Sequence, residues 1–492
     1  MRDTNVKAEI VGGSPVFHNF IAGQALPADE GRTTANTNPA TGETIGYFPD
    51  STVRDVELAV SAADEAQQKW ARTAPVVRAA IVAKAAAILQ DRLETVARDL
   101  TREEGKTIGE ARGETQNAIA KINYAVGEAQ RMAGETLPSA DESVHLYTLR
   151  EPLGVIAVIS PWNFPLSTPA GKVGIALVTG NTVVMKPASL TPLSAIHLVQ
   201  AFADAGVPPG VLNLVIGGGG TIGDALVCDP RVCGISFTGS TSVGIGIAQK
   251  AAANLSKTQF ELGGKNPLVV MDDADIDMAA RAAVDGAFLS CGQKCTATSR
   301  IIVHRDVKRA LIAKMLEFVN AITIGNGLDP RSYMGPLVDG RQLRSVASYI
   351  ERGRQEGARL LTGGEILSDT EYVNGFFVTP AIFDDVEPSM CIAREEIFGP
   401  VLSVLTVQSF EQALEYANAS DYGLSSAIFT RSLRYAQEFA RCIQAGVVKV
   451  NGQTPGNAVN APFGGRKRSG AGISLKQIDF FTELKSVYQR PV

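Results

Sequence analysis

Apolar residues recur at helical spacing in the first third of the chain. Between Thr52 and Thr101 an alanine-rich stretch carries them three and four positions apart, and a second such stretch runs from about Thr107 to Arg131. This period predicts amphipathic helices in both places. The first 50 residues follow no clear period, and we expect them to be irregular. The segment SVHLYTLREP, from Ser143 to Pro152, alternates apolar and polar positions and predicts an exposed strand.

After Pro152 short apolar runs alternate with helical patterns. The runs are GVIAVISPWNFP, NTVVMKPA, GVLNLVIGGGG and CGISFTGS, and helices are expected from about Leu193 to Ala205 and from about Thr221. This alternation predicts βαβ units and a parallel sheet. Ligands of such sheets bind at the carboxyl ends of the strands. Those ends carry Asn163, Lys186, Gly217–Gly220 and Ser240.

A second α/β region begins near Gly263. Its predicted strands are NPLVVM, RIIVH, FVTPAIF and PVLSVLTV, and the loop NGQTPGNAVNAPFGG is expected to end it. The final segment, FFTELKSVYQRP, alternates like a strand. A chain of 492 residues exceeds what one hydrophobic core usually serves, so we expect two or three domains.

Composition narrows the class of protein. Hydrophobic residues make up 45% of the chain and the net charge is −5, without the basic tract of a nucleic-acid-binding protein. No apolar run reaches the roughly 18 residues of a membrane span, and the N-terminus lacks the layout of a signal peptide, so we expect a cytoplasmic protein. Six cysteines make no disulfide framework in a chain of this length.

Four strand-end motifs are candidates for chemistry. The glycines in VIGGGGTIGDAL can hold a phosphate at a helix N-terminus, although such a run equally suits a tight turn. Lys186 can reach a ribose or a phosphate, although a lysine in that place is more often solvated. Glu261 can act as a general base or cap a turn. SFTGSTSVG adds a second turn with hydroxyl and backbone donors.

SCGQKCTATSR holds two cysteines with different surroundings. A zinc site would need Cys291 and Cys295 together with Cys228 and Cys233, but neither pair shows a zinc-knuckle pattern, so we expect no metal. Cys291 suits core packing. Cys295 lies among polar residues and is a candidate nucleophile.

Seven motifs in order carry a resemblance to a known family: SPWNFP, VVMKPAS, SFTGS, FELGGKNP, GQKCTATSR, EEIFGPV and APFGGRKRSGAG. Over nearly the whole chain the sequence resembles the NAD(P)-dependent aldehyde dehydrogenase superfamily. The resemblance implies an α/β fold with two parallel-sheet domains and a small β extension. The expected division is 1–130 with 151–262 for the NAD(P)-binding domain, 263–465 for the catalytic domain, and 131–150 with 478–492 for an extension that joins subunits into a homodimer or homotetramer.

The resemblance also implies roles for single residues. Cys295 would attack the aldehyde, and the side chain of Asn163 and the backbone N–H of Cys295 would stabilise the oxyanion. Glu261 would activate water to hydrolyse the thioester, and Lys172 would take part in the proton network around Glu261. The cofactor would lie against Trp162, Lys186, Ser189, Gly219, Gly223, Ser240, Glu396 and Phe398. The substrate would meet Phe164, Ser167, Thr168, Gly171, Leu289, Lys294, Gln453 and Asn457.

Two features of the sequence bear on the cofactor and on the substrate. Ser189 stands where NAD-preferring members often carry glutamate, so we expect NADP to be accepted or preferred and NAD to be used too. The cysteine motif is similar to that of 2-oxoglutarate semialdehyde dehydrogenases. Succinate semialdehyde dehydrogenases typically grip the substrate carboxylate with two arginines, at the positions of Gly171 and Leu289; Lys294, Arg466 or Arg468 remain as substitutes.

The pocket residues predict an oxygenated or semialdehyde-type substrate and a free-acid product. A succinate semialdehyde dehydrogenase with another carboxylate grip stays an alternative. Acyl transfer from the thioester to coenzyme A is a second alternative, although members with that chemistry usually lack the glutamate base, and Glu261 is present.

Overall fold

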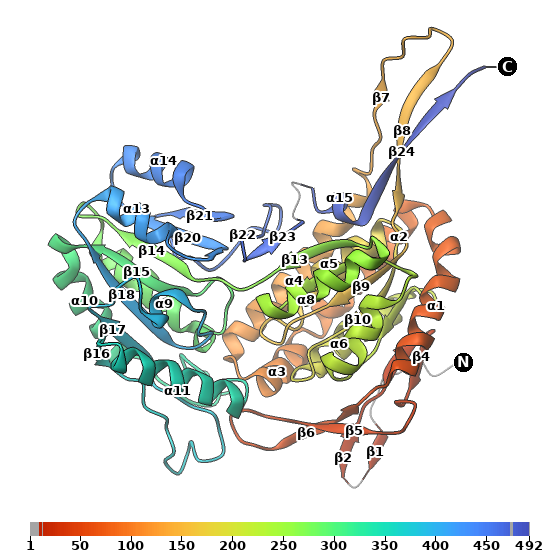
Figure 1. Ribbon diagram of the computed structural model, residues 1–492. Coiled ribbons are helices and arrows are strands. Elements are labelled where there is room, and N and C mark those ends of the chain that lie inside the picture. Colours follow the sequence, from red (N-terminus) through yellow and green to blue (C-terminus); the bar gives the residue numbers. More distant parts are fainter. Residues whose placement is uncertain (1–8, 12, 473–475, 492) are drawn as a thin grey trace.

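The structure, a computed structural model, describes residues 9–11, 13–472 and 476–491. Two lobes, each built around a β-sheet, lie side by side, and a β-arm projects from one of them (Figure 1). The expected α/β class with parallel sheets is confirmed. The domain boundaries stay a prediction, and their parts at residues 1–8, 12 and 492 lie outside the described residues.

The first sheet has eight strands in the order β23-β13-β12-β9-β10-β11-β3-β4. The strands from β13 to β11 are parallel, while β23, β3 and β4 are antiparallel to their neighbours. Their bounds are β3 Asn19–Ile21, β4 Gln24–Leu26, β9 Val155–Ile159, β10 Thr182–Lys186, β11 Leu212–Leu214, β12 Val232–Thr238, β13 Lys257–Glu261 and β23 Gly470–Ala471.

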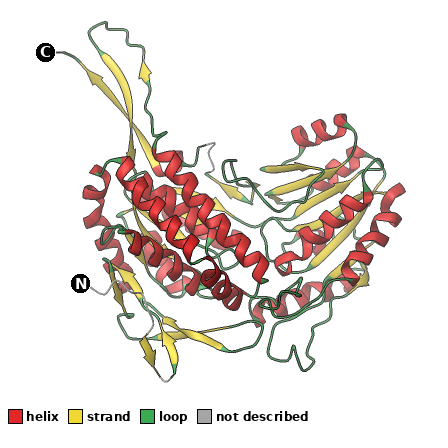
Figure 2. Cartoon of the chain, turned by 180° about the vertical axis from the view of Figure 1, so that it is seen from behind, coloured by secondary structure: helices red, strands yellow, loops and turns green. Residues whose placement is uncertain are grey.

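Helices cover both faces of this sheet (Figure 2). They are α1 Val53–Arg72, α2 Pro75–Asp91, α3 Leu93–Glu104, α4 Ile108–Ala129, α5 Ser167–Val178, α6 Pro192–Ala205, α7 Asp224–Cys228 and α8 Thr241–Ala251. Because side chains alternate along a strand, β9 serves two cores. Ile156 and Val158 pack with the α2–α6 layer, whereas Val155, Ala157 and Ile159 pack with α1, α7 and α8.

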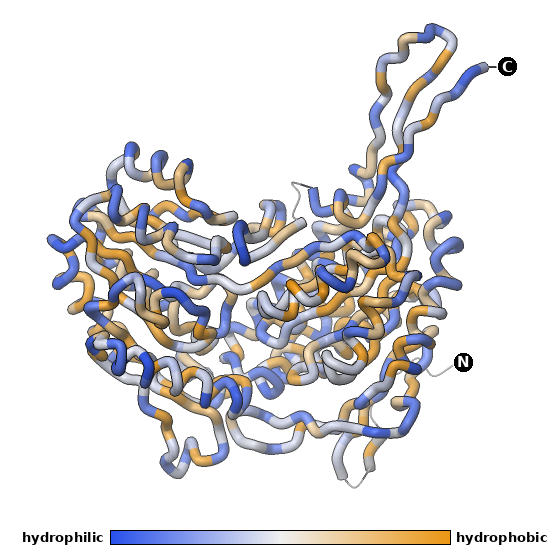
Figure 3. Tube along the Cα trace, in the orientation of Figure 1, coloured by the Kyte–Doolittle hydropathy of each residue, from blue (hydrophilic) through white to orange (hydrophobic). Residues whose placement is uncertain are grey.

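The second sheet has seven strands in the order β16-β17-β18-β15-β14-β20-β21, all parallel except β16. The strands are β14 Asn266–Val270, β15 Thr298–His304, β16 Arg359–Thr362, β17 Ala381–Asp384, β18 Val401–Val407, β20 Ser425–Phe429 and β21 Val447–Val450. The helices of this lobe are α9 Ile276–Phe288, α10 Arg305–Asn320, α11 Gly340–Gln355, α12 Cys391–Arg394, α13 Phe410–Asn418 and α14 Leu433–Cys442. Hydrophobic positions concentrate in its strands (Figure 3).

The arm is a three-stranded antiparallel sheet in the order β24-β8-β7. Its strands are β7 Thr136–Leu137, β8 His145–Pro152 and β24 Thr482–Gln489, and the short helix α15 Ile478–Phe481 precedes β24. Both strands predicted for this region are present, as β8 and β24. They pair over their full length, with Thr482 opposite Pro152 and Gln489 opposite His145. The strands β19 Tyr422–Gly423 and β22 Arg466–Lys467 form a separate pair.

The expectation that the first 50 residues are irregular was wrong. Besides β3 and β4, they form a four-stranded sheet from β1 Glu9–Val11, β2 Ser14–Val16, β5 Thr33–Thr37 and β6 Thr44–Pro49. Strands this short leave too few positions for a period of two to be visible in the sequence.

No single helix among the described residues is long and apolar enough to span a membrane. The pair α1 and α2 meets the length and composition test jointly, but it bends by 119° between the two helices.

Candidate active site

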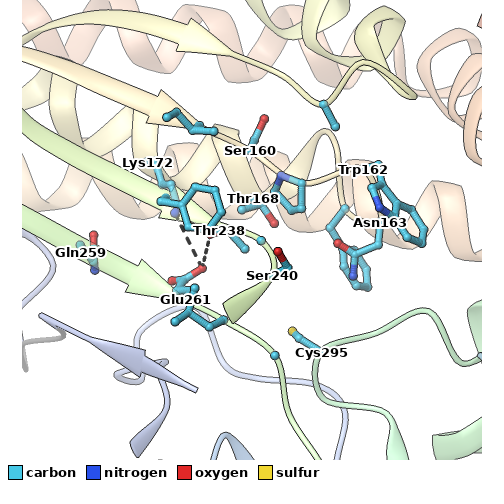
Figure 4. Close-up of a pocket in the computed structure, with 18 of the residues that line it drawn as sticks. Ser160, Trp162, Asn163, Thr168, Lys172, Thr238, Ser240, Gln259, Glu261 and Cys295 are labelled. Atoms are coloured by element: carbon cyan, nitrogen blue, oxygen red, sulfur yellow. Dashed lines mark hydrogen bonds and ion pairs between the residues drawn. The ribbon is translucent and has the colours of Figure 1, made fainter. Parts of the chain in front are cut away.

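A cavity of about 970 Å³ opens where the carboxyl ends of the first sheet's parallel strands face the second lobe. Asn163 follows β9, Thr238 ends β12 and Glu261 ends β13, while Cys295 comes from the loop before β15. Figure 4 shows these four side chains around one pocket. The structure therefore brings together residues that lie up to 132 positions apart.

Cys295 is a half-buried thiol between two carboxylates. Burial, followed by the charges of Glu396 and Glu261, raises the pKa of Cys295 to about 12. The backbone N–H groups of Thr296 and Cys295 act in the opposite direction, because they donate to the sulfur. The resting group is therefore a thiol at neutral pH, and it must lose its proton to a base before it can act as a nucleophile.

The loop that carries Cys295 is fixed by backbone contacts. Asn266 donates its side-chain N–H to the carbonyl oxygen of Cys295 at 2.8 Å and to that of Ala297 at 2.9 Å. Ser290 and Cys291 adopt left-handed backbone angles, with φ of 56° and 53°, which are unfavourable for residues other than glycine. Cys291 itself is buried in the second core. The sequence analysis quoted the motif containing Asn266 but gave this residue no role.

Glu261 belongs to a hydrogen-bonded chain. Thr238 lies opposite Glu261 in the parallel ladder and donates its hydroxyl to the Glu261 carboxylate at 2.9 Å. Lys172, on α5, donates to the Thr238 hydroxyl at 2.6 Å and lies 3.9 Å from the same carboxylate oxygen. Burial lowers the pKa of Lys172 to about 8, so this ammonium can exchange a proton near neutral pH. Thr238 was missed because its role depends on the strand register.

Asn163 lies in a turn that is fixed by two buried charged side chains, Lys106 and Glu114. One N–H of its side-chain amide donates to the carbonyl of Gln293 at 2.9 Å, which leaves the second N–H for a ligand. The backbone carbonyl of Asn163 accepts from Lys106 at 2.7 Å. Lys106 also pairs with Glu114 at 2.6 Å, and Glu114 accepts the backbone N–H of Ser167 at 3.0 Å.

The other end of the cavity suits a nucleotide. Of the residues expected at the cofactor, these line the cavity: Trp162, Lys186, Gly219, Gly223, Ser240, Glu396 and Phe398. A Cβ on Gly219 would meet nothing within 4 Å, so this turn is open to a phosphate. A Cβ on Gly223 would come no nearer than 3.9 Å to another group, the Lys186 stem. Burial lowers the pKa of Lys186 to about 8, and an anionic ligand would offset the cost of that buried charge.

The carboxylate of Glu396 lies against Gly263, where any side chain would overlap it. This carboxylate accepts the backbone N–H of Gly264 at 2.8 Å. Burial raises the pKa of Glu396 to about 7. The group is therefore poised to bind hydroxyls in either protonation state.

Ser189 lies at the rim rather than inside. The residue is exposed, it is not among the described residues that line the cavity, and its hydroxyl donates to the carbonyl of Gly217 at 3.0 Å. A phosphate at this rim would have to draw the hydroxyl away from Gly217.

At the substrate end, the expected residues that line the cavity are Phe164, Ser167, Thr168, Gly171, Lys294 and Asn457. Leu289 and Gln453 differ from the expectation. Leu289 begins the tight turn Leu289–Gly292, and Gln453 is exposed, so neither contributes to the lining. Arg466 and Arg468 are exposed outside the cavity as well. Helix α4 contributes two residues that the sequence analysis did not name, Asn117 and Lys121.

Comparisons with known proteins show the family of the chain. The model of the aldehyde dehydrogenase family matches residues 26–487. The alpha-ketoglutaric semialdehyde dehydrogenase of Bacillus subtilis is 45% identical over 481 residues, which is 96% of this chain and 98% of that protein. An NAD-dependent aldehyde dehydrogenase from Sinorhizobium meliloti has a TM-score of 0.94 at 35% identity, covering 97% of this chain and 95% of its own. An NADP-dependent enzyme of E. coli has a TM-score of 0.94 at 32% identity, covering 99% of each chain.

The environment of Cys295 predicts how its thiol reacts. With a pKa of about 12, its alkylation by iodoacetamide should be slow at pH 7 and rise about tenfold per pH unit up to pH 10, because the thiolate reacts. In Glu396→Gln one negative charge is gone, so the pKa of Cys295 falls and alkylation at pH 8 becomes faster. Mass spectrometry of the Cys295 peptide measures the rate.

The neighbouring carboxylate provides the control for this measurement. Glu395 binds Tyr349 and Arg352, away from the sulfur, so Glu395→Gln should leave the alkylation rate unchanged. A rate that is already constant between pH 7 and pH 10 would contradict the high pKa.

Proposed function

The chain belongs to the aldehyde dehydrogenase family, and we propose that it oxidises 2-oxoglutarate semialdehyde to 2-oxoglutarate with NAD or NADP. The observation that carries the chemistry is the meeting of Cys295, Asn163 and Glu261 on one cavity. In the overall reaction the aldehyde carbon loses a hydride and gains the oxygen of water, and two protons are released.

We propose that the first step is attack by Cys295. The bond from sulfur to the aldehyde carbon forms, and the thiol proton passes to the Glu261 carboxylate. The carbonyl oxygen becomes an oxyanion, which the free N–H of the Asn163 side chain and the backbone N–H of Cys295 stabilise. NAD or NADP, when bound, would supply the hydride acceptor for this carbon, and Cys295 would then hold the product as a thioester.

Hydrolysis is then the work of Glu261. After Glu261 has released the thiol proton to solvent, its carboxylate takes a proton from water while the water oxygen attacks the thioester carbon. The bond to sulfur then breaks and leaves the Cys295 thiolate, which takes up a proton. Thr238 connects Glu261 to Lys172, whose pKa of about 8 allows it to take up and release protons. This base also favours hydrolysis over acyl transfer to coenzyme A, which remains the alternative chemistry.

The cofactor assignment has two supports. The Gly219 turn, buried Lys186 and Glu396 fit the phosphates and the ribose of a dinucleotide. Ser189 at the rim carries no negative charge to repel a 2′-phosphate, and the solved structures of the same fold include an NAD-dependent and an NADP-dependent enzyme. We therefore propose that both cofactors are used.

The substrate proposal rests on the name of the relative with 45% identity and on the polar residues of the pocket. Without arginines at Gly171 and Leu289, the pocket has no grip of the kind expected in succinate semialdehyde dehydrogenases.

Assembly into a homo-oligomer is a further part of the proposal. In the arm, β8 is the middle strand, and its partner β24 carries Leu484 and Tyr488, which are 62% and 72% exposed. Leu149 of β8 is 44% exposed. A projecting sheet with exposed apolar residues is suited to contact another subunit.

A panel of aldehydes tests the substrate. Appearance of the reduced nicotinamide at 340 nm should give the highest kcat/KM with 2-oxoglutarate semialdehyde, a lower value with succinate semialdehyde, and the lowest with acetaldehyde. NAD and NADP should differ by less than about tenfold in kcat/KM, since no like charge faces the 2′-phosphate. A preference for acetaldehyde would contradict the proposal.

Two variants test the catalytic roles. Cys295→Ala should abolish turnover, because no thioester can form. Glu261→Gln should still release one equivalent of reduced nicotinamide, in a slower burst because the thiol has lost its base, while steady-state hydrolysis falls by about 100- to 10,000-fold. Stopped-flow absorbance separates the two phases. Unchanged turnover in Cys295→Ala, or normal hydrolysis in Glu261→Gln, would refute the mechanism.

Light scattering tests the assembly. The wild type should have the mass of a dimer or tetramer, and Leu484→Asp should shift the population to smaller species, because a charge would be buried at the contact. Leu433 is 71% exposed on α14, away from the arm, and Leu433→Asp is the matched control that should leave the mass unchanged. A monomeric wild type would contradict the proposal.

A further inference from the structure

Three lysines line the substrate end of the cavity, and they face different partners. Lys172 is bound to Thr238 and serves Glu261. Lys294 is half-buried, and the charges that act on it most are those of Glu110 and Lys106. Lys121, on α4, is acted on by the charges of Glu261, Glu114 and Cys295. Of the three lysines, Lys121 lines the cavity while its hydrogen bond goes to the backbone carbonyl of Ser167 rather than to the base.

We propose that Lys121 binds the carboxylate of the substrate at the end opposite the aldehyde, which makes it the residue that selects carboxylate-bearing aldehydes. The proposal rests on the proposed function and deepens it, since it names the group that recognises the substrate.

The ammonium of Lys121 has N–H groups that are available to a ligand. Its Nζ donates one hydrogen bond, to the backbone carbonyl of Ser167 at 3.1 Å, and an ammonium has three N–H groups. The remaining two can receive a carboxylate in the cavity. Burial lowers the pKa of Lys121, which means that the charged form lacks full compensation in the free protein. A bound carboxylate would supply that compensation.

Gly171 provides the space in which Lys121 lies. A Cβ at Gly171, on α5, would come within 3.2 Å of the Lys121 Cδ and 3.7 Å of its Cβ. The absence of a side chain on α5 therefore lets the lysine stem of α4 lie against α5. A side chain at the position of Gly171 would require the stem of Lys121 to move. The carboxylate grip expected on α5 is replaced here by one from α4.

Asn117 extends the same recognition surface. It precedes Lys121 by one helical turn on α4, so the two side chains lie on the same face of the helix, and both line the cavity. An amide N–H suits a ketone oxygen, and an ammonium suits a carboxylate. A 2-oxo acid presents these two groups on adjacent carbons, which matches the distal end of 2-oxoglutarate semialdehyde.

The test compares charged and neutral aldehydes in the same variants. Lys121→Met keeps the length of the stem and removes the charge, and Lys121→Arg keeps the charge. Steady-state kinetics with 2-oxoglutarate semialdehyde, succinate semialdehyde, butanal and pentanal gives kcat/KM for each. For Lys121→Met we expect a loss of about 10- to 100-fold with both carboxylate-bearing aldehydes, mainly through KM, and a change below about twofold with the neutral ones.

The controls separate recognition from a structural role. Lys121→Arg should recover most of the selectivity. Lys84 is an exposed lysine on α2 outside the cavity, so Lys84→Met should match the wild type with every substrate. If Lys121→Met lowers kcat/KM equally for charged and neutral aldehydes, or for none of them, the inference is overturned. If Lys121→Met does not fold, Gly171→Val, which crowds the lysine stem, must show the same charge-selective loss, and a uniform loss would overturn the inference.

The wild-type panel distinguishes failure of the inference from failure of the proposed function. A wild type that prefers succinate semialdehyde to butanal through Lys121, but is inactive on 2-oxoglutarate semialdehyde, supports carboxylate recognition and overturns the proposed substrate. A wild type that prefers 2-oxoglutarate semialdehyde with no charge-selective loss in Lys121→Met keeps the proposed function and overturns the inference.

Discussion

The ion pair between Lys106 and Glu114 is the interaction on which the rest of the site depends. Both side chains are about 1% exposed, and each also holds backbone: Lys106 donates to the carbonyl of Asn163, and Glu114 accepts the N–H groups of Leu166 and Ser167. Such a pair contributes little net stability, because both charges lose their hydration. Its effect is positional. It fixes the turn with Asn163 and the start of α5 against α4, and thereby places Lys172 and Gly171.

A second set of constraints comes from backbone atoms that approach closely. Asn266 fixes the carbonyl of Cys295, Gly263 leaves room for Glu396, and Gly292 lies so near the Gly399 carbonyl that a Cβ there would overlap it. These contacts join the cysteine loop to the segment that carries Glu396. Burial, and after it the two carboxylates, keep the sulfur a thiol, and these carboxylates hold the positions proposed for the base and for the ribose. The cost of a high thiol pKa therefore follows from the chemistry that the site has to perform.

The sequence was informative where local pattern decides the structure. Buried apolar runs located the strands, and their carboxyl ends located Asn163, Lys186 and Glu261, because a parallel sheet gathers those ends at one edge. Thr238 and Lys121 could not be found in this way. The function of Thr238 depends on its register opposite Glu261, and that of Lys121 depends on a helix crossing. Short strands in the first 50 residues lacked enough positions to show a period.

Leu289 and Gln453 were predicted to line the substrate pocket but do not, because a position relative to a motif does not fix the direction of a side chain. Each lies close in sequence to cavity residues, but the backbone turns at Leu289–Gly292 and in the exposed loop of Gln453 separate them from the lining. The reacting groups follow strands or lie in loops pinned by buried contacts, whereas Lys121 and Gly171 lie on facing helices. A change of the helical pair alters which side chain holds the distal end of the substrate without displacing Cys295, Asn163 or Glu261. The carboxylate grip can therefore move from α5 to α4 while the chemistry stays in place.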